Sequence, residues 1–264
     1  MDLELTGKVA VVTGGSDGIG LAIAQAFAAE GAHSLICARD EQRLKEAAAL
    51  VGAGGKVRCV GVQADLSHRD GPARVAAAAH REFGGIDFLI NNAGTGTNET
   101  IMEADDEKWD RFWNLHVMAA VRLARALVPM MKARGGGVIL NNASICASQP
   151  LGYEPIYNVT KAALVMLSKC MANEFIGLNI RVNAVNPGLI KTRDWVKTAT
   201  ALGAKEGISA DEYLSRIAKE NAPIGRFATP EELASFFVFL CSQRASYSVG
   251  SSYYVDGGWL RTIS

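Results

Sequence analysis

The fold of this chain is decided by the stretch Thr13-Gly14-Gly15-Ser16-Asp17-Gly18-Ile19-Gly20. An apolar run, residues 9–12, precedes it and an alanine-rich run, residues 19–30, overlaps its end, so a turn is predicted between a buried strand and a helix. Glycines at such a turn let the backbone approach a pyrophosphate, and the helix N-terminus offers unpaired N–H groups. The spacing G-x-x-x-G-x-G departs from the common G-x-G-x-x-G, and a tight turn without a ligand would also explain it.

Short β-branched runs alternate with alanine-rich helical stretches along most of the 264 residues. The predicted strands are 9–12, 33–38, 57–62, 86–90, 137–141, 180–185 and 252–255, and the predicted helices are 19–30, 41–51, 72–83, 106–132, 157–175 and 230–241. This alternation predicts an α/β fold, a single-domain Rossmann fold with a doubly wound parallel sheet of about seven strands and helices on both faces. One domain is expected over residues 1–264, with a lid over the pocket at about 189–223.

Charge restricts the class of partner. The chain carries 27 basic and 27 acidic residues, and its formal net charge is zero. Without a block of like charge it lacks the basic field that a nucleic-acid groove or an anionic membrane surface requires. Arg122 and Arg125 interrupt the best apolar run, residues 117–131, which is too short to span a membrane. We expect a small-molecule partner, no nucleic acid and no membrane.

The N-terminus and the cysteines indicate the compartment. Acidic residues stand where a signal peptide needs a basic region. The five cysteines are widely spaced and form no C-x-x-C pair, which predicts buried free thiols in a reducing cytoplasm rather than a disulfide framework. The four histidines lack the spacing of metal ligands, so no metal site is expected.

Tyr157 and Lys161 lie four residues apart in a predicted helix, so both side chains project from one face, about 6 Å apart along the axis. An ammonium at this distance would lower the pKa of the phenol by roughly 2 to 3 units, toward a pH at which the phenol exchanges protons. Alone, the pair is also explained by a half-buried tyrosine and a surface lysine. Ser144 ends the fifth predicted strand, and Asn114 stands on the apolar face of a predicted helix, where asparagine is unfavourable unless its side chain is used.

Other polar residues follow predicted strands at the carboxyl edge of the sheet, where ligands bind in such folds. Asn91-Asn92-Ala93-Gly94 ends the fourth strand, and Asp65 ends the third, where its carboxylate can accept a hydrogen bond from an adenine amino group. Together with the glycine turn, these segments predict a dinucleotide that crosses the edge of the sheet.

Over nearly its whole length the chain resembles the short-chain dehydrogenase/reductase family. The resemblance rests on the glycine turn, Asn91-Asn92-Ala93-Gly94, Ser144, the Y-x-x-x-K pair and Pro187-Gly188-Leu189-Ile190-Lys191-Thr192. It implies an enzyme that transfers hydride between a nicotinamide and a carbonyl or secondary alcohol. The catalytic residues it implies are Asn114, Ser144, Tyr157 and Lys161. Tyr157 would exchange the proton, Ser144 polarise the carbonyl, Lys161 anchor the ribose, and Asn114 bind a water that links Lys161 to solvent.

The resemblance also assigns the cofactor site. The residues are Gly14, Ser16, Asp17, Gly18, Ile19, Gly20, Arg39, Asp65, Leu66, Asn92, Ala93, Gly94, Tyr157, Lys161, Pro187, Gly188, Ile190 and Thr192. Ala38 stands where members that prefer NAD usually carry Asp, and Arg39 follows it as in members that prefer NADP. Asp17 argues the other way, because many NADP-using members have a basic residue there. NADP(H) is therefore favoured, and NAD(H) remains an alternative.

The substrate is the least determined part of the prediction. The pocket is expected to be lined by residues 145–156, including Tyr153, by Thr95 and Gly96, and by the lid. Residues 221–227 and 255–258 are similar to those of 3-oxoacyl-thioester reductases, which makes such a ketone the first choice. A sugar, steroid or hydroxy-acid dehydrogenase is the alternative, and a non-catalytic NADP-binding sensor or scaffold a distant one. The family also implies a homo-oligomer, commonly a tetramer.

Overall fold

The computed structural model describes residues 2–262 and places seven strands in one parallel sheet. The strands run in the order β3-β2-β1-β4-β5-β6-β7, and each neighbouring pair is parallel. They are β1 (Val9–Thr13), β2 (His33–Ala38), β3 (Cys59–Gln63), β4 (Phe88–Asn91), β5 (Gly137–Asn142), β6 (Ile180–Pro187) and β7 (Ser252–Val255). The predicted doubly wound Rossmann fold is confirmed, with the order reversing between β1 and β4.

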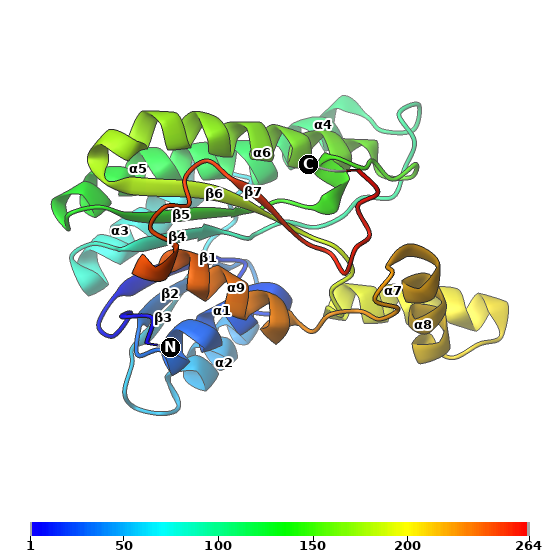
Figure 1. Ribbon diagram of the computed structural model, residues 1–264, viewed down its shortest axis with the longest axis horizontal. Coiled ribbons are helices and arrows are strands. Elements are labelled where there is room, and N and C mark those ends of the chain that lie inside the picture. The colour runs from blue at the N-terminus through cyan, green and yellow to red at the C-terminus, as the bar shows by residue number, and fades with distance from the viewer. Residues whose placement is uncertain (1, 263–264) are drawn as a thin grey trace.

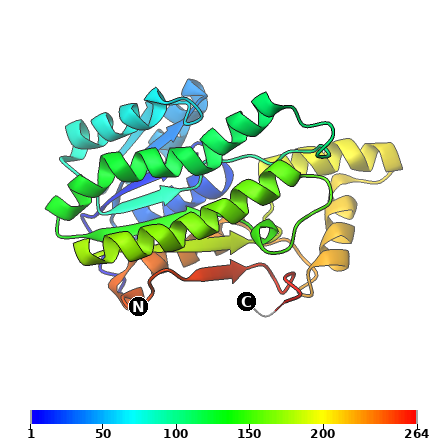
Figure 2. The ribbon, with the colours of Figure 1, turned by 90° about the horizontal axis from the view of Figure 1, so that it is seen from above.

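Helices cover both faces of the sheet (Figure 1). One face packs against α1 (Gly18–Ala29), α2 (Glu41–Gly52) and α9 (Pro230–Cys241), and the other against α3 (Asp70–Phe83), α5 (Ala119–Ala133) and α6 (Pro155–Phe175). Figure 2 shows the second set side by side over the strands. Along β1, Ala10 and Val12 join the first core, while Val9 and Val11 join the second. A strand buried on both faces must be apolar throughout, which explains the run that precedes the glycine turn.

The helix predicted over residues 106–132 is divided in the structure. α4 (Asp106–Trp113) is followed by a π-helical turn (Asn114–Met118) and then by α5. A π turn contains one more residue than an α turn, so it changes which residues of the helix face the sheet. It thereby determines which side chain of this helix reaches the carboxyl edge.

Residues 189–223, expected to be a polar lid, contain two helices that the sequence analysis did not predict. α7 (Arg193–Glu206) and α8 (Ala210–Asn221) form a pair set apart from the sheet and its layers (Figure 1). Their apolar contacts form a small core of their own around Ala199 and Leu214.

Hydrogen bonds define both the helices of this pair and its base. Ser209 begins α8 in a capping box with Glu212, a motif that was readable in the sequence. At the base, the N–H of Ala228 donates to the carbonyl of Leu189 at 2.9 Å, and the N–H of Lys191 donates to the carbonyl of Ala228 at 2.8 Å. The segment therefore leaves and re-enters the fold at one hydrogen-bonded point.

Polar side chains hold the ends of β1, β4 and β5 in register. Thr13 Oγ1 accepts the N–H groups of Asn92 at 2.8 Å and Ala93 at 2.9 Å, and Asn92 Nδ2 donates to Thr13 O at 2.9 Å. Asn142 Nδ2 donates to Asn92 Oδ1 at 2.8 Å. Because buried amides must find partners, these bonds fix the three strand ends that surround the order reversal.

Membrane and thiol features can be stated for residues 2–262. Within that range no helix combines the length and the apolarity needed to cross a membrane. All five cysteines are free thiols. The expectation that they are buried holds for Cys37, Cys146 and Cys241, whereas Cys59 is only partly buried and Cys170 is exposed on α6.

We predict that Gly20→Ala destabilises the fold at the glycine turn. A Cβ at this position would lie 2.2 Å from the carbonyl oxygen of Gly14 and 2.6 Å from Asn92 Nδ2, and the backbone atom has no room to move aside. The expected loss is about 1 to 3 kcal/mol of unfolding free energy, as for other overpacked sites. Thermal unfolding measures it, with Gly54→Ala as control, since a Cβ there meets nothing within 4 Å. Equal melting temperatures for the two variants would contradict the prediction.

Candidate active site

Ser144, Tyr157 and Lys161 gather at the carboxyl edge of β5. Ser144 follows this strand and begins a short 3₁₀ turn, where its Oγ accepts the N–H of Cys146 at 3.2 Å. Lys161 is buried in α6, and its Nζ donates to the carbonyl of Asn142 at 2.7 Å. This Nζ lies 5.3 Å from the ring centroid of Tyr157, and Ser144 is close enough to the Tyr157 hydroxyl to counteract part of the rise in its pKa. The three residues predicted from their spacing are thus brought together.

The protonation states of this group differ from the sequence expectation. Burial raises the pKa of Tyr157 above its ordinary value, and the nearby Cys146 and Glu154 add to the rise. Burial also lowers the pKa of Lys161 to about 8. The rise in the pKa of Tyr157 is opposite in direction to the shift predicted from the charge of Lys161 alone, because burial is its largest cause. Tyr157 is a protonated phenol at neutral pH, which suits it to donate a proton to a carbonyl oxygen.

Asn114 is not part of the group, and its assignment to the site needs correction. Its Nδ2 donates to the carbonyl of Asp110 at 2.8 Å, and its Oδ1 accepts from Arg122 Nη2 at 2.7 Å. Both partners belong to the same helical segment, so the amide caps its own helix instead of facing the cluster.

His116, two residues further on, occupies the place that was predicted for Asn114. Its buried ring packs edge to face on Tyr157 with centroids 5.6 Å apart. On the same side, a Cβ added to Gly94 would lie 3.2 Å from His116 Nε2 and 3.6 Å from Lys161 Nζ. Side chains two residues apart in a helix point in nearly opposite directions, about 200° apart. At most one of Asn114 and His116 can therefore face the site.

Hydrogen bonds determine the tautomer of His116. Thr160 Oγ1 donates to the carbonyl of Ile156 at 2.8 Å, so toward His116 Nδ1, also at 2.8 Å, it must accept. The proton is therefore on Nδ1, and Nε2 accepts from the N–H of Thr95 at 3.4 Å. Burial, with Lys161 as a second cause, lowers the pKa of His116 to about 2, so the ring is neutral.

Sequence reasoning missed His116 although a signal was present. Residue 116 lies four positions after Phe112 and seven before Leu123, both buried, so it continues the apolar face of the helix. The rings of Phe112 and His116 are 5.4 Å apart. His116 was considered only as a metal ligand, on the spacing of the histidines along the chain. Its closeness to Tyr157 could not be read from the sequence.

The glycine turn fits the pyrophosphate of a dinucleotide. The N–H groups of Ile19 and Gly20 open α1 and meet no acceptor among residues 2–262, as expected for a helix N-terminus. Gly14 has a φ of +66°, and a Cβ there would lie 3.0 Å from Ala93 Cα. The turn can therefore pack on the end of β4 only with glycine. The N–H groups of Gly14 and Gly15 donate to the carbonyl of Cys37 at 2.9 and 3.2 Å, which fixes the turn on β2.

Asp17, the acidic residue in this turn, is already paired. Its Oδ1 accepts the N–H of Gly18 at 2.7 Å, and its Oδ2 lies 3.5 Å from Arg193 Nη1 at the start of α7. Its charge is thus met by the N-terminus of α1 and by a cation of the lid. The pairing offsets part of the negative charge of Asp17, while the basic residue that many NADP-using members carry at this position is still lacking.

Arg39 and Asp65 lie together where β2 and β3 end. Arg39 is exposed, and its guanidinium is close enough to contribute to lowering the pKa of Asp65, although burial works in the opposite direction. Asp65 Oδ1 accepts from the N–H and hydroxyl of Ser67 at 2.9 and 2.7 Å. The arrangement leaves the Arg39 side chain free for an anion at the adenosine end of the groove.

Four further residues predicted to hold the cofactor lie at the end of β6 and directly after it: Pro187, Gly188, Ile190 and Thr192. A Cβ on Gly188 would lie 2.7 Å from Asp256 Cα, so glycine is required for the close approach of these two segments. Ile190 is buried, and Thr192 caps α7 and lies next to Gly18, with 3.6 Å between its methyl group and a Cβ added to Gly18. The lid thus begins directly above the glycine turn.

Glu154 is a buried carboxylate in the predicted substrate loop. Its Oε1 lies 3.6 Å from Cys146 Sγ, and its Oε2 would be 3.4 Å from a Cβ on Gly96. Burial is the main cause that raises its pKa to about 7. Residues 145–156 were predicted to line the pocket, but Glu154 was not singled out among them. Its signal was that it is the one charged residue of this loop.

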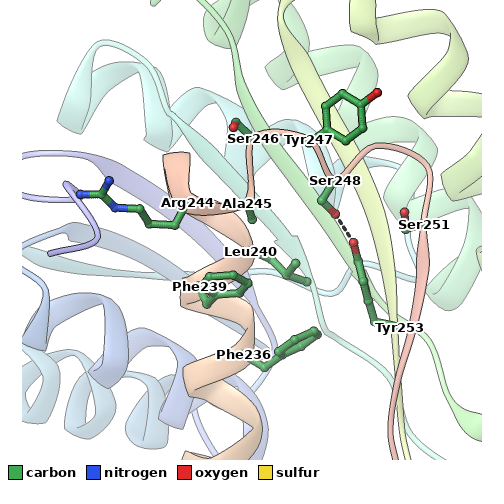
Figure 3. A pocket seen from close by; sticks show the side chains of 10 residues that line it. All are labelled: Phe236, Phe239, Leu240, Arg244, Ala245, Ser246, Tyr247, Ser248, Ser251 and Tyr253. Atoms are coloured by element: carbon green, nitrogen blue, oxygen red, sulfur yellow. Dashed lines mark hydrogen bonds between the residues drawn. The ribbon is translucent and has the colours of Figure 1, made fainter. Parts of the chain in front are cut away.

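Tyr153, predicted to line the pocket, is half exposed beside Glu154, and its carbonyl accepts the N–H of Glu99 at 2.9 Å. A separate groove of about 370 Å³ lies between α9 and β7 (Figure 3). Phe236, Phe239 and Tyr253 line part of it, and none of its lining residues belongs to the predicted site. The groove is therefore distinct from the catalytic edge.

Comparisons with known proteins agree with this geometry. Residues 14–260 match the family described as enoyl-(acyl carrier protein) reductase. The rabbit (Oryctolagus cuniculus) dehydrogenase/reductase SDR family member 4 is 37% identical over 96% of this chain and 94% of its own. Galactitol 2-dehydrogenase of Agrobacterium fabrum is 35% identical over 98% of this chain and 100% of its own.

A solved structure is more similar still. L-sorbose reductase from Gluconobacter frateurii, complexed with NADPH and L-sorbose, is 61% identical to this chain. The two superpose with a TM-score of 0.98 over 100% of each chain.

We predict that His116→Ala lowers kcat at least tenfold, whereas Asn114→Ala changes it less than threefold. The histidine contacts Tyr157, but the asparagine bonds only its own helical segment. Steady-state kinetics on the two variants and the wild type measure the difference. A larger loss in Asn114→Ala than in His116→Ala, at equal melting temperature, would restore the original assignment.

Proposed function

The chain belongs to the short-chain dehydrogenase/reductase family, and on this premise we propose that it reduces the keto group of a ketose sugar with NADPH. That it is an NAD(P)-dependent oxidoreductase follows from the family; the ketose is the proposal. The observation that carries it is the 61% identity, over 100% of both chains, to a reductase solved with NADPH and L-sorbose. The 3-oxoacyl substrate, first choice from the sequence, becomes the alternative.

The wall of the pocket supports a polyhydroxylated substrate over an acyl chain. Glu154 is only 8% exposed, and a buried carboxylate is costly unless hydrogen-bond donors reach it. Among described residues, its neighbours Cys146 and Thr97 offer one thiol and one N–H. Sugar hydroxyls would supply further donors, whereas the methylene groups of a fatty acyl chain would leave the carboxylate poorly solvated.

In the proposed reaction the residues of the cluster handle the proton. Bound NADPH supplies the hydride. Tyr157 donates its proton to the carbonyl oxygen, which the Ser144 hydroxyl orients, and the Lys161 ammonium stabilises the phenolate that forms. His116 packs on the ring of Tyr157 and keeps it over Lys161. In the reverse direction the phenolate takes the proton of the alcohol.

We infer self-association from exposed apolar side chains. Trp113 on α4 and Val159 and Met166 on α6 are 41%, 48% and 66% exposed. β7 is the last strand of the sheet and leaves one edge unpaired, beside the groove of Figure 3. The proposal of a homo-oligomer, as the family implies, is tested by light scattering after size-exclusion chromatography. A monomer at micromolar concentration would contradict it.

We predict that the wild type, with NADPH, has a higher kcat/KM for a ketohexose than for a β-ketoester. We also predict that Glu154→Gln lowers kcat/KM for the ketohexose at least tenfold and leaves kcat/KM for the β-ketoester unchanged. The pKa of Glu154 is raised to about 7, so the group is a carboxylate above pH 7 and a neutral acid below it. A carboxylate accepts stronger bonds from hydroxyls, so KM for the ketose should fall as pH rises through 7.

Glu154→Gln cannot ionise, so its KM should not follow that pH change. Tyr157→Phe serves as the inactive control, with an expected loss of about 10² to 10⁴ in kcat. Equal or better turnover of the β-ketoester by the wild type would overturn the ketose proposal and restore the 3-oxoacyl alternative.

We predict that Arg39→Ala raises KM for NADPH about tenfold and leaves KM for NADH within twofold. Its exposed guanidinium stands where β2 ends and would pair with the 2′-phosphate that NADH lacks. Initial rates at saturating ketose give both constants. If Arg39→Ala affects the two cofactors equally, Arg39 does not read the phosphate.

A further inference from the structure

The segment after β7, residues 256–261, is a rigid hook at the C-terminal end of the described chain. Gly257 and Gly258 have φ values of +64° and +85°, a conformation that favours glycine, and they reverse the chain. The carboxylate of Asp256 accepts the N–H groups of Gly258 at 3.0 Å and Leu260 at 2.7 Å. The N–H of Trp259 donates back to the carbonyl of Asp256 at 3.2 Å.

The hook packs on the point where the lid returns to the fold. The N–H of Ile224 donates to the carbonyl of Gly257 at 3.1 Å. A Cβ on Gly257 would lie 2.5 Å from Ile224 Cγ2, and one on Gly258 would lie 3.2 Å from Pro223 Cγ. The residues that follow α8, Pro223 and Ile224, therefore rest directly on the backbone of the hook.

The hook is also bonded to the substrate loop. Gln149 Nε2 donates to the carbonyl of Trp259 at 3.5 Å, and Gln149 Oε1 accepts the N–H of Arg261 at 3.1 Å. Just before the hook, the hydroxyls of Tyr254 and Ser148 are 2.5 Å apart. The loop that continues from Ser144 is thus tied to the hook through Gln149 and to β7, directly before the hook, through Ser148.

Trp259 fills the space between these parts. It is 6% exposed and belongs to a small apolar cluster separate from the two cores of the sheet. The cluster contains Ile145 and Cys146 of the substrate loop, Leu189 at the start of the lid, and Ala218 and Ala222 of the α8 end. The rings of Tyr157 and Trp195 pack against the same cluster.

We propose that the hook is a positioning element of the active site, in which Trp259 sets the distance between the substrate loop and the lid. By setting this distance, Trp259 determines which carbonyl compounds fit over Tyr157. Trp259 is a positioning residue, because it acts through the loop and the lid. The inference rests on the carbonyl reductase activity and not on the ketose, so it is tested with whichever carbonyl compound the wild type reduces fastest.

The experiment compares Trp259→Ala, Trp259→Phe and Arg261→Ala. Arg261→Ala is the matched control, because it removes an exposed side chain and keeps the backbone bond to Gln149. In Trp259→Ala we expect KM for the carbonyl compound to rise at least tenfold, with the NADPH Kd, measured by fluorescence without substrate, within twofold. The ratio of kcat/KM between a short and a long carbonyl compound should change at least fivefold. In Trp259→Phe, which keeps an aromatic ring at this position, both the KM and the kcat/KM ratio should stay close to the wild-type values.

If Trp259→Ala does not fold, Gln149→Ala provides a second test. This variant removes only the side-chain hydrogen bonds between the substrate loop and the hook. It should raise the same KM at least threefold without changing the NADPH Kd. Wild-type KM and selectivity in the folded variants would overturn the proposal, as would a parallel loss of NADPH binding and melting temperature. Failure of the ketose proposal would be seen in the wild type alone, so the two failures are distinguishable.

Discussion

The hydrogen bond from the Lys161 ammonium to the carbonyl of Asn142 is the interaction on which the site depends. It joins α6 to the end of β5, and the side chain of the same asparagine continues to Asn92 and from there to β1. Burying the Lys161 ammonium without this acceptor would be strongly unfavourable, because the charge would lose its hydration without compensation. The position of Lys161 is therefore coupled to the register of β1, β4 and β5. The catalytic group and the floor of the cofactor groove are in this sense one structure.

Much of the fold and part of the site could be predicted from the sequence. The order of strands and helices was readable because buried parallel strands are apolar throughout, and Tyr157 and Lys161 were readable because a helix repeats every 3.6 residues. Asn114 was singled out because asparagine is a poor helix former, and His116 was considered only as a metal ligand. The direction in which each side chain points depends on packing, which the sequence does not contain. α7 and α8 were missed because their faces are largely polar and their core is small. The burial of Glu154 depends on loops distant in sequence, which no local pattern contains.

The distribution of charge explains how a chain of zero net charge can hold a polyanion. Among the described residues, the N–H groups of Ile19 and Gly20 at the start of α1 meet no acceptor and are available to the expected phosphates, and Asp17 nearby is paired with Arg193. The segment proposed as a lid therefore places a cation beside the glycine turn. Arg39 stands alone at the far end, where the two nicotinamide cofactors differ. Few charged side chains are needed to bind an anionic cofactor, because backbone dipoles and helix N-termini attract the phosphates at short range.

The π-helical turn at Asn114–Met118 restricts how this gene can change. Loss of one codon there would restore a regular α-helix with better backbone hydrogen bonds, and by local stability alone it would be tolerated. The same deletion would rotate α4 by about 100° relative to α5 and carry His116 away from Tyr157. Selection for activity would therefore retain the π-helical turn, whereas selection for helix stability alone would remove it. A sequence alignment that places a gap in this turn would pair residues that do not correspond in the structure.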